Sequence, residues 1–194
     1  MNEYMNKIYA ELKTQMSAWR YEHTMGVMYT AAALAMRYDV NIEKAMLAGL
    51  LHDCAKTKAY PPERLLNLCQ EHGVPISESE AKKPDLLHAK AGAYLALQKY
   101  GVYDQEILQA ISCHTTGRPN MTLLDKILYI ADFIEPGRDE ALNLPQVRKL
   151  AFVKLEDCLL RILEDSLVYL EKKKDIIDPM TSETYKYYIK QLKK

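Results

Sequence analysis

The stretch MLAGLLHDCAK, residues 46–56, decides the fold, because an apolar helical run ends there in two adjacent ionisable residues, His52 and Asp53. The apolar part of the run belongs in a protein core. Asp is almost never fully buried unless it is paired, and an unpaired buried charge costs on the order of several kcal/mol. The chain must therefore provide a common partner for His52 and Asp53 inside its core.

The rest of the 194-residue chain has the same helical character. Apolar residues recur at helical rather than alternating spacing, and only seven glycines and eight prolines interrupt them. This pattern predicts an all-α fold with a loop near residues 175–181, where an Asp-Pro turn breaks a long amphipathic helix. Helices are expected at residues 3–16, 20–38, 42–54, 61–72, 77–82, 85–100, 104–114, 122–134, 145–172 and 181–193.

Local signals mark several helix ends. The segment TLLD, residues 122–125, has the spacing of a capping box, so Asp125 is predicted to begin a helix rather than to act in catalysis. Pro62 suits a first helical turn, and Gly73 suits a C-terminal cap. His72 precedes Gly73 on a polar segment, so we predict that it lies at the surface.

The composition excludes several classes of protein. Apolar residues make up 48% and charged residues 27%, and 26 basic side chains balance 26 acidic ones, which argues against a general electrostatic grip on nucleic acid or anionic membrane. No apolar run approaches the ~18 residues that a membrane span needs. The four cysteines form no C-x-x-C pair and no signal peptide is apparent, so we expect reduced thiols and a cytoplasmic protein.

Further ionisable residues share helix faces with apolar side chains. His23 lies on one face with Val27 and Leu34, and Asp132 follows Leu128 by four residues. A single inward histidine is more often a satisfied core residue than a ligand, but a set of this size is hard to produce by packing alone. The six residues expected to face one interior are His23, His52, Asp53, His88, His114 and Asp132.

Two metal ions would satisfy this whole set. Neutral imidazoles supply nitrogen ligands, carboxylates supply oxygen ligands, and a cation removes the cost of the buried negative charge. The sequence therefore predicts a buried metal site on a helical scaffold.

These residues resemble the signature of the HD-domain metal-dependent phosphohydrolases, which stands here as His23, His52–Asp53 and Asp132. The fuller pattern is similar to the subfamily of symmetrical diadenosine tetraphosphate hydrolases over roughly residues 18 to 184. It comprises R-x-x-H at 20–23, GLLHDCAK at 49–56, LLHAKAGA at 86–93, ISCHTTG at 111–117, DKILYIADFIEPGR at 125–138 and I-x-P-x-T at 177–181.

The resemblance implies a single HD domain over residues 1–194, with a core at about 18–140 and a C-terminal helical extension at about 141–194. It implies metal-dependent hydrolysis of diadenosine tetraphosphate to two ADP, at a site with one or two iron ions for which Mn, Co or Mg can substitute. His23, His52, Asp53 and Asp132 would hold the first metal. His88 and His114 would either hold a second metal or contact phosphate.

Roles for individual residues follow from the same resemblance and the needs of phosphoanhydride hydrolysis. Asp53 would bridge the metals and take the proton of the attacking water, and Lys56 and Arg138 would clamp phosphate, with Arg20 a weaker candidate. The catalytic set is Asp53, Lys56, His88 and His114. Gly117 and Arg118 would widen the mouth of the site after His114. The implied nucleotide contacts are His23, Asp53, His88, His114, Asp132, Arg138, Ile177, Asp178, Pro179, Met180, Thr181 and Ser182.

Three alternatives remain open at this level. The same ligands suit another nucleotide substrate, such as a deoxynucleoside triphosphate, a nucleoside monophosphate or a guanosine polyphosphate. They also suit a di-iron oxygenase, or a nucleotide-binding regulator without turnover. The expected partners are a small dinucleoside polyphosphate and its ADP product, without nucleic acid or membrane. Exposed tyrosines at positions 185, 187 and 188 suit either a homodimer contact or packing on the chain itself.

Overall fold

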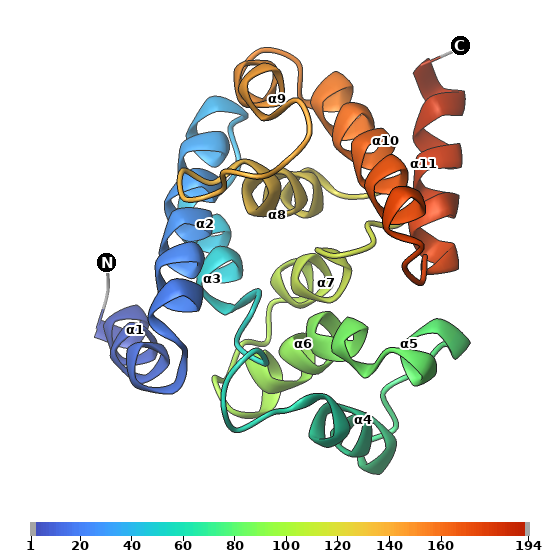
Figure 1. The fold of residues 1–194 in the computed structure, drawn as a ribbon. Helices are drawn as coiled ribbons and strands as arrows, with labels where there is room; N and C mark the ends of the chain where they lie inside the picture. Colours follow the sequence, from blue (N-terminus) through green and yellow to red (C-terminus); the bar gives the residue numbers. More distant parts are fainter. Residues whose placement is uncertain (1–2, 193–194) are drawn as a thin grey trace.

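The computed structural model describes residues 3–192, and all regular structure in that range is helical, which confirms the predicted fold class (Figure 1). A short 3₁₀ segment, η1, joins α5 to α6. The elements are α1 (Glu3–Gln15), α2 (Ala18–Arg37), α3 (Ile42–Leu51), α4 (Pro62–Glu71), α5 (Glu78–Lys82), η1 (Pro84–Leu87), α6 (His88–Gln98), α7 (Gln105–Cys113), α8 (Leu123–Ile134), α9 (Leu144–Ala151), α10 (Leu155–Lys173) and α11 (Pro179–Leu192).

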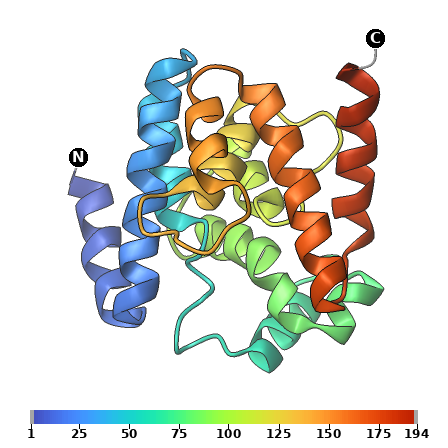
Figure 2. The same ribbon diagram turned by 45° about the horizontal axis from the view of Figure 1, so that its top comes forward.

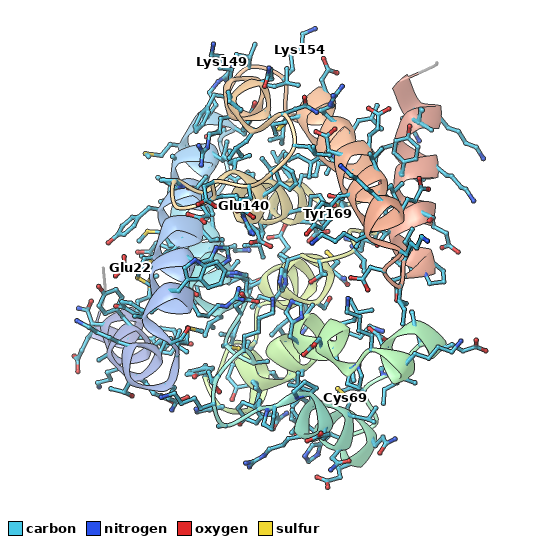
Figure 3. All side chains as sticks on the ribbon, viewed as in Figure 1. Glu22, Cys69, Glu140, Lys149, Lys154 and Tyr169 are labelled. Carbon is cyan, nitrogen blue, oxygen red and sulfur yellow. The ribbon has the colours of Figure 1, made fainter. Side chains whose placement is uncertain are left out.

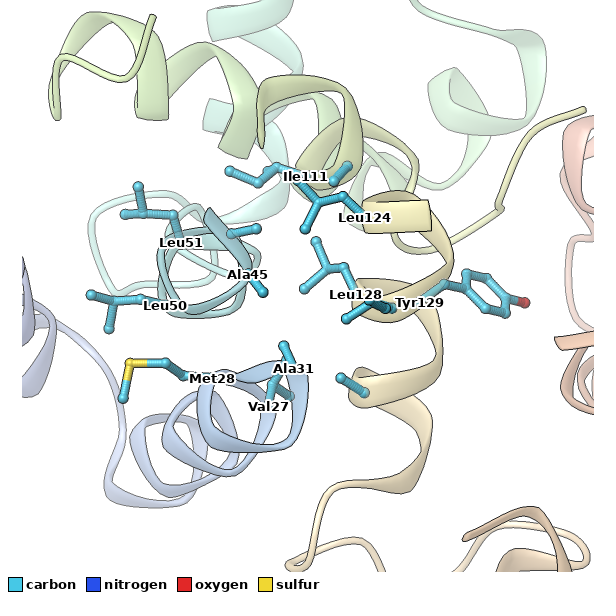
Figure 4. Packing of buried hydrophobic residues seen from close by; sticks show 14 of the residues in the cluster. Val27, Met28, Ala31, Ala45, Leu50, Leu51, Ile111, Leu124, Leu128 and Tyr129 are labelled. Atoms are coloured by element: carbon cyan, nitrogen blue, oxygen red, sulfur yellow. The ribbon is translucent and has the colours of Figure 1, made fainter. Parts of the chain in front are cut away.

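The core lies between α2, α3, α7 and α8, which pack against one another around the buried helix α3. Figure 4 shows apolar side chains from all four helices meeting there, among them Met28, Leu51, Ile111 and Leu128. These side chains are fully buried, and each contributes about 1.5–3 kcal/mol relative to an exposed position. The apolar part of the stretch at residues 46–56 is therefore the centre of the core.

The close contact between α2 and α3 depends on Gly49. A Cβ atom added to Gly49 would lie 2.7 Å from the Cα of Met28, so the backbones of the two helices approach one another directly. This approach brings the side chains of His23 on α2 and His52 after α3 into contact.

The predicted capping signals are confirmed. Thr122 and Asp125 form a reciprocal capping box at the start of α8, and Arg118 pairs with the same Asp125 carboxylate at 2.7 Å. Pro62 is the first residue of α4, and Gly73 adopts a φ of +66° just after that helix. Asp125 and Arg118 thus serve the helix start, and the role of Arg118 at the mouth of the site stays a prediction.

The predicted helix at 145–172 is wrong, because two helices, α9 and α10, occupy that range. The sequence is compatible with one continuous helix, but the last residue of α2 and the residue after it donate hydrogen bonds at the end of α9. Arg37 donates to the carbonyl of Phe152 at 2.7 Å, and Tyr38 donates to the carbonyl of Ala151 at 2.6 Å. These donors satisfy carbonyls that a helix would otherwise use internally.

Two other predicted helices are shorter than expected, and each boundary involves a histidine. The run expected at 42–54 ends at Leu51, because the ring of His52 donates to the Gly49 carbonyl at 2.7 Å, which the Asp53 N–H would need to extend the helix. The run expected at 85–100 begins as η1, and α6 itself starts at His88.

The C-terminal helices α10 and α11 lie side by side along one flank (Figure 2). The loop between them spans residues 174–178, which overlaps the region predicted at 175–181, and α11 starts at Pro179. Tyr188 is buried and its hydroxyl accepts the Met121 N–H at 2.8 Å, while Tyr185 and Tyr187 pack against the core. These tyrosines thus pack on the chain itself, and a homodimer contact at the partly buried Tyr185 and Tyr187 stays a prediction.

Among residues 3–192, no helix has both the length and the apolar character needed to cross a membrane.

Replacing Gly49 by Ala should lower the free energy of unfolding by about 2 kcal/mol, because the new methyl group overlaps the α2 backbone. Urea unfolding followed by circular dichroism measures the change. The control is Met36→Ala on α2, where the side chain is 64% exposed and the expected change is within about 0.5 kcal/mol. Equal stability of the two variants would contradict the inferred close approach of the helices.

Candidate metal centre

The carboxylate of Asp53 lies at the centre of the site and is almost completely buried. Its Oδ2 atom lies 3.4 Å from Nε2 of His52 and 3.9 Å from Nε2 of His23. Its Oδ1 atom lies 3.6 Å from Nε2 of His88 and 3.7 Å from Nε2 of His114. Each oxygen of this one carboxylate therefore faces its own pair of imidazoles.

The histidines of each pair also approach one another. His23 and His52 have their Nε2 atoms 3.3 Å apart, as do His88 and His114. Asp132 joins the first pair, with its Oδ1 atom 3.1 Å from Nε2 of His23. The structure thus brings together all six ionisable residues predicted to face one interior, from α2, α6, α8 and the turns that follow α3 and α7.

Two overlapping groups have the spacing of metal ligands. One consists of His23, His52 and Asp132, and the other of His52, Asp53 and His114, with the ligand atoms in each group within 4.8 Å of one another.

Each histidine ring is fixed through its second nitrogen. The Nδ1 atoms of His52, His88 and His114 donate to the backbone carbonyls three residues earlier, at 2.7, 2.6 and 2.7 Å. These bonds place the proton on Nδ1 and leave the Nε2 lone pair facing the centre, which is the form that binds a metal ion.

Glu135 anchors the remaining ring, and the sequence reasoning missed it. Its Oε1 atom lies 3.1 Å from Nδ1 of His23, and its Oε2 atom accepts the Gly137 N–H at 2.5 Å. The contact is tight, because a Cβ atom on Gly26 would lie 2.5 Å from that same oxygen. A signal was available in the sequence, since Glu135 is a carboxylate only three residues after Asp132, directly after the helix that carries it.

Electrostatics set the protonation states that metal ligands need. Burial by itself would raise the pKa of the Asp53 carboxyl, but the electrostatic influence of the neighbouring His52 and Lys56 side chains holds that pKa well below its usual range. Burial also opposes ionisation of Asp132, yet the neighbouring imidazoles, His23 first among them, lower its carboxyl pKa. Burial lowers the pKa of His88 well below its usual range. These shifts favour ionised carboxylates and a neutral His88.

A divalent cation fits this set of residues. Oδ1 of Asp53 is buried and accepts no hydrogen bond from the described part of the chain. An orphaned carboxylate oxygen surrounded by imidazole Nε2 atoms is costly unless a cation lies among them. Nitrogen and carboxylate oxygen together suit a first-row transition metal.

Three cationic side chains border the centre. Arg20 contacts Oδ2 of Asp53 at 2.6 Å, and Lys56 lies 3.3 Å from Oδ1 of the same residue. Arg138 contacts Oδ1 of Asp132 at 3.0 Å. Arg20 was the weaker candidate from the sequence, but its contact with a carboxylate of the centre is the shortest of the three.

Two cavities adjoin the centre. The first, which we call the acidic cavity, has a volume of about 550 Å³ and contains His114 and Asp132. The loop between α8 and α9 and the inner face of α10 form its walls, where Figure 3 labels Glu140 and Tyr169. The second, the basic cavity, has a volume of about 670 Å³ and contains Arg20, Lys56 and His88.

Residues 177–182 line neither cavity among the described residues. The Asp178 carboxylate is buried and accepts hydrogen bonds from Ser79 at 2.5 Å and Ser77 at 3.2 Å, which attaches the start of α11 to α5. Gly117 packs against Thr184 on α11. Contact of this segment with a nucleotide stays a prediction.

His72 is exposed, as predicted, and its ring stacks on Tyr94 with centroids 4.7 Å apart. It takes no part in the centre, so the sequence reasoning separated it correctly from the inward histidines.

Comparison with known proteins agrees with this geometry. Residues 20–137 match the model of the HD domain family. The chain is 40% identical over 178 residues to a protein of Bacillus subtilis (strain 168) named "Bis(5'-nucleosyl)-tetraphosphatase, symmetrical", which covers 92% of this chain and 94% of that protein. A protein of the same name from Halalkalibacterium halodurans is 39% identical over 177 residues, covering 90% and 91% of the two chains.

A solved structure has the same fold. The crystal structure of a "predicted HD superfamily hydrolase involved in NAD metabolism" from Clostridium acetobutylicum superposes with a TM-score of 0.91 at 39% identity, over 96% of this chain and 97% of that one. The ligand pattern, the family match and this likeness agree, and the chain belongs to the HD-domain family.

Proposed function

We propose that this protein hydrolyses diadenosine tetraphosphate at its central phosphoanhydride bond and releases two molecules of ADP. The observation that carries the proposal is the Asp53 carboxylate, whose two oxygens each face a pair of imidazoles. The names of the relatives, which share 39–40% of residues over at least 90% of this chain, favour this substrate over the other nucleotides considered.

The proposed cofactor is iron, as one or two divalent ions, with Mn, Co or Mg as substitutes. His23, His52, Asp53 and Asp132 would hold the first ion, and Asp53 would share its second oxygen with His88 and His114 for another. Bound divalent ions supply charge compensation for the attacked phosphoryl group and lower the pKa of water from ~15.7 toward ~7.

The remaining chemistry belongs to residues of the chain. Asp53 would accept the proton of the attacking water on a carboxylate oxygen. Lys56 and Arg138 border the centre as partly buried cations and would bind the phosphate oxygens that gain charge as the anhydride breaks. Arg20 would hold the Asp53 carboxylate in position.

Product analysis tests this function. Metal-loaded protein incubated with diadenosine tetraphosphate should give ADP as sole product, resolved by anion-exchange chromatography, and chelator should abolish turnover. A mixture of ATP and AMP, or no turnover at all, would contradict symmetrical cleavage.

Changing Asp53 to Ala should remove bound metal and reduce kcat/KM by at least about a thousandfold, since several kcal/mol of charge stabilisation is lost. Metal analysis of the purified variant and the ADP-release assay measure the two effects. Full activity with metal retained would show that the assigned role is wrong.

The matched histidine control is His72→Ala. This exposed side chain contacts Tyr94 and no residue of the centre, so activity should stay within about twofold of the wild type. A large loss would mean that the division between ligand and surface histidines is incorrect.

Replacing Glu135 by Gln should weaken metal binding by about 10–100-fold, because a neutral amide supports the His23 ring less well than a carboxylate does. Competition with a fluorescent chelator measures the affinity independently of turnover. The control is Glu22→Gln, which changes the exposed carboxylate next to His23 in sequence and should leave metal affinity unchanged. Equal affinities in both variants would refute the proposed support of His23 by Glu135.

A further inference from the structure

We propose that the two chemically identical halves of the substrate bind in two unlike cavities, one half held mainly by its nucleoside in the acidic cavity and the other mainly by its diphosphate in the basic cavity. This inference rests on the proposed function, because only a symmetrical dinucleotide cut at its middle presents two such halves.

The two cavities adjoin the metal centre at different residues. A bond at the middle of the substrate must lie over the metal centre, so the two halves must extend from the centre in different directions. The acidic cavity reaches the centre at His114 and Asp132, and the basic cavity reaches it at Arg20 and His88. Trp19 lines both cavities, so they meet beside the histidine cluster.

Both cavities have the size of a small-molecule pocket. Ligand pockets for small molecules commonly have volumes of about 300–1,000 Å³. At about 550 and 670 Å³, each cavity is large enough for one nucleoside diphosphate. The substrate therefore has a place for each half without any rearrangement of the helices.

The charged residues of the two cavities indicate which half of the substrate binds in each cavity. Lys58, Lys83, Lys56 and Arg20 line the basic cavity, where Asp85 is the one acidic side chain among the described lining residues. Phosphate groups bind such a cluster through charge-assisted hydrogen bonds. Lys58 is exposed and forms no ion pair with any residue of the described chain, so it is free to contact phosphate.

The acidic cavity has the opposite character. Among the described residues that line it, Arg138 is the one Lys or Arg side chain. Five carboxylates and several apolar or aromatic side chains line the same cavity. Ribose hydroxyls and the adenine amino group donate hydrogen bonds, which carboxylates accept, and aromatic walls suit the base. The acidic lining residues are Asp132, Glu135, Asp139, Glu140 and Asp165.

The two products should therefore bind with different affinities. Isothermal titration of ADP into the metal-loaded wild-type protein should show two molecules per chain, bound at unequal sites. Lys58→Glu should weaken one of these sites by about fivefold or more through repulsion of phosphate and leave the other within about twofold. The control is Lys82→Glu, an exposed neighbour of Lys83 that lines neither cavity, which should change neither site.

Turnover gives the second readout. With diadenosine tetraphosphate, Lys58→Glu should raise KM by about fivefold while kcat stays within about twofold, and Lys82→Glu should behave like the wild type. One ADP per chain in the wild type, or the same response to both substitutions, would overturn the two-cavity assignment. Failure of the wild type to cleave diadenosine tetraphosphate would instead refute the proposed function, so the two failures are distinguishable.

Discussion

The buried carboxylate of Asp53 is the constraint on which the rest of the structure depends. A charge removed from water in this way costs several kcal/mol unless other groups compensate for it. Four parts of the chain compensate for this charge together. Helices α2 and α6 and the ends of α3 and α7 each place an imidazole or a cation within 4 Å of that carboxylate. The glycine contact between α2 and α3 serves the same end, since it allows His23 and His52 to meet.

Helix ends supply the precision of the site. His52, His88 and His114 lie where a helix stops or starts, and each ring donates to a carbonyl three residues earlier. The same hydrogen bond thus orients a ligand and satisfies a backbone group at the helix boundary. His23 lies within α2, where the backbone carbonyls are used by the helix. Its ring is therefore held by Glu135, which also attaches the α8–α9 loop to the centre.

The distribution of charge around the centre suits a symmetrical substrate bound by an asymmetric chain. The N-terminal half of the molecule contributes the cations of the basic cavity, through α2, the loop after α3 and Lys83, whereas α8, the α8–α9 loop and α10 contribute the carboxylates of the acidic cavity. A single chain has no symmetry axis through this site, so identical halves of a ligand meet different surroundings. Helix α10 therefore does more than extend the fold, because it forms a wall of the acidic cavity.

The sequence by itself determined the helical class, the capping of α8 and the six inward ionisable residues, because helical periodicity and local hydrogen bonding are set by near neighbours along the chain. Tertiary structure decided what depends on distant residues. The break between α9 and α10 needs donors from Arg37 and Tyr38, and the roles of Glu135 and Arg20 follow from contacts with His23 and Asp53 that appear only when the helices pack. The two cavities likewise form between elements far apart in sequence, so their size and charge cannot be predicted from a local sequence pattern.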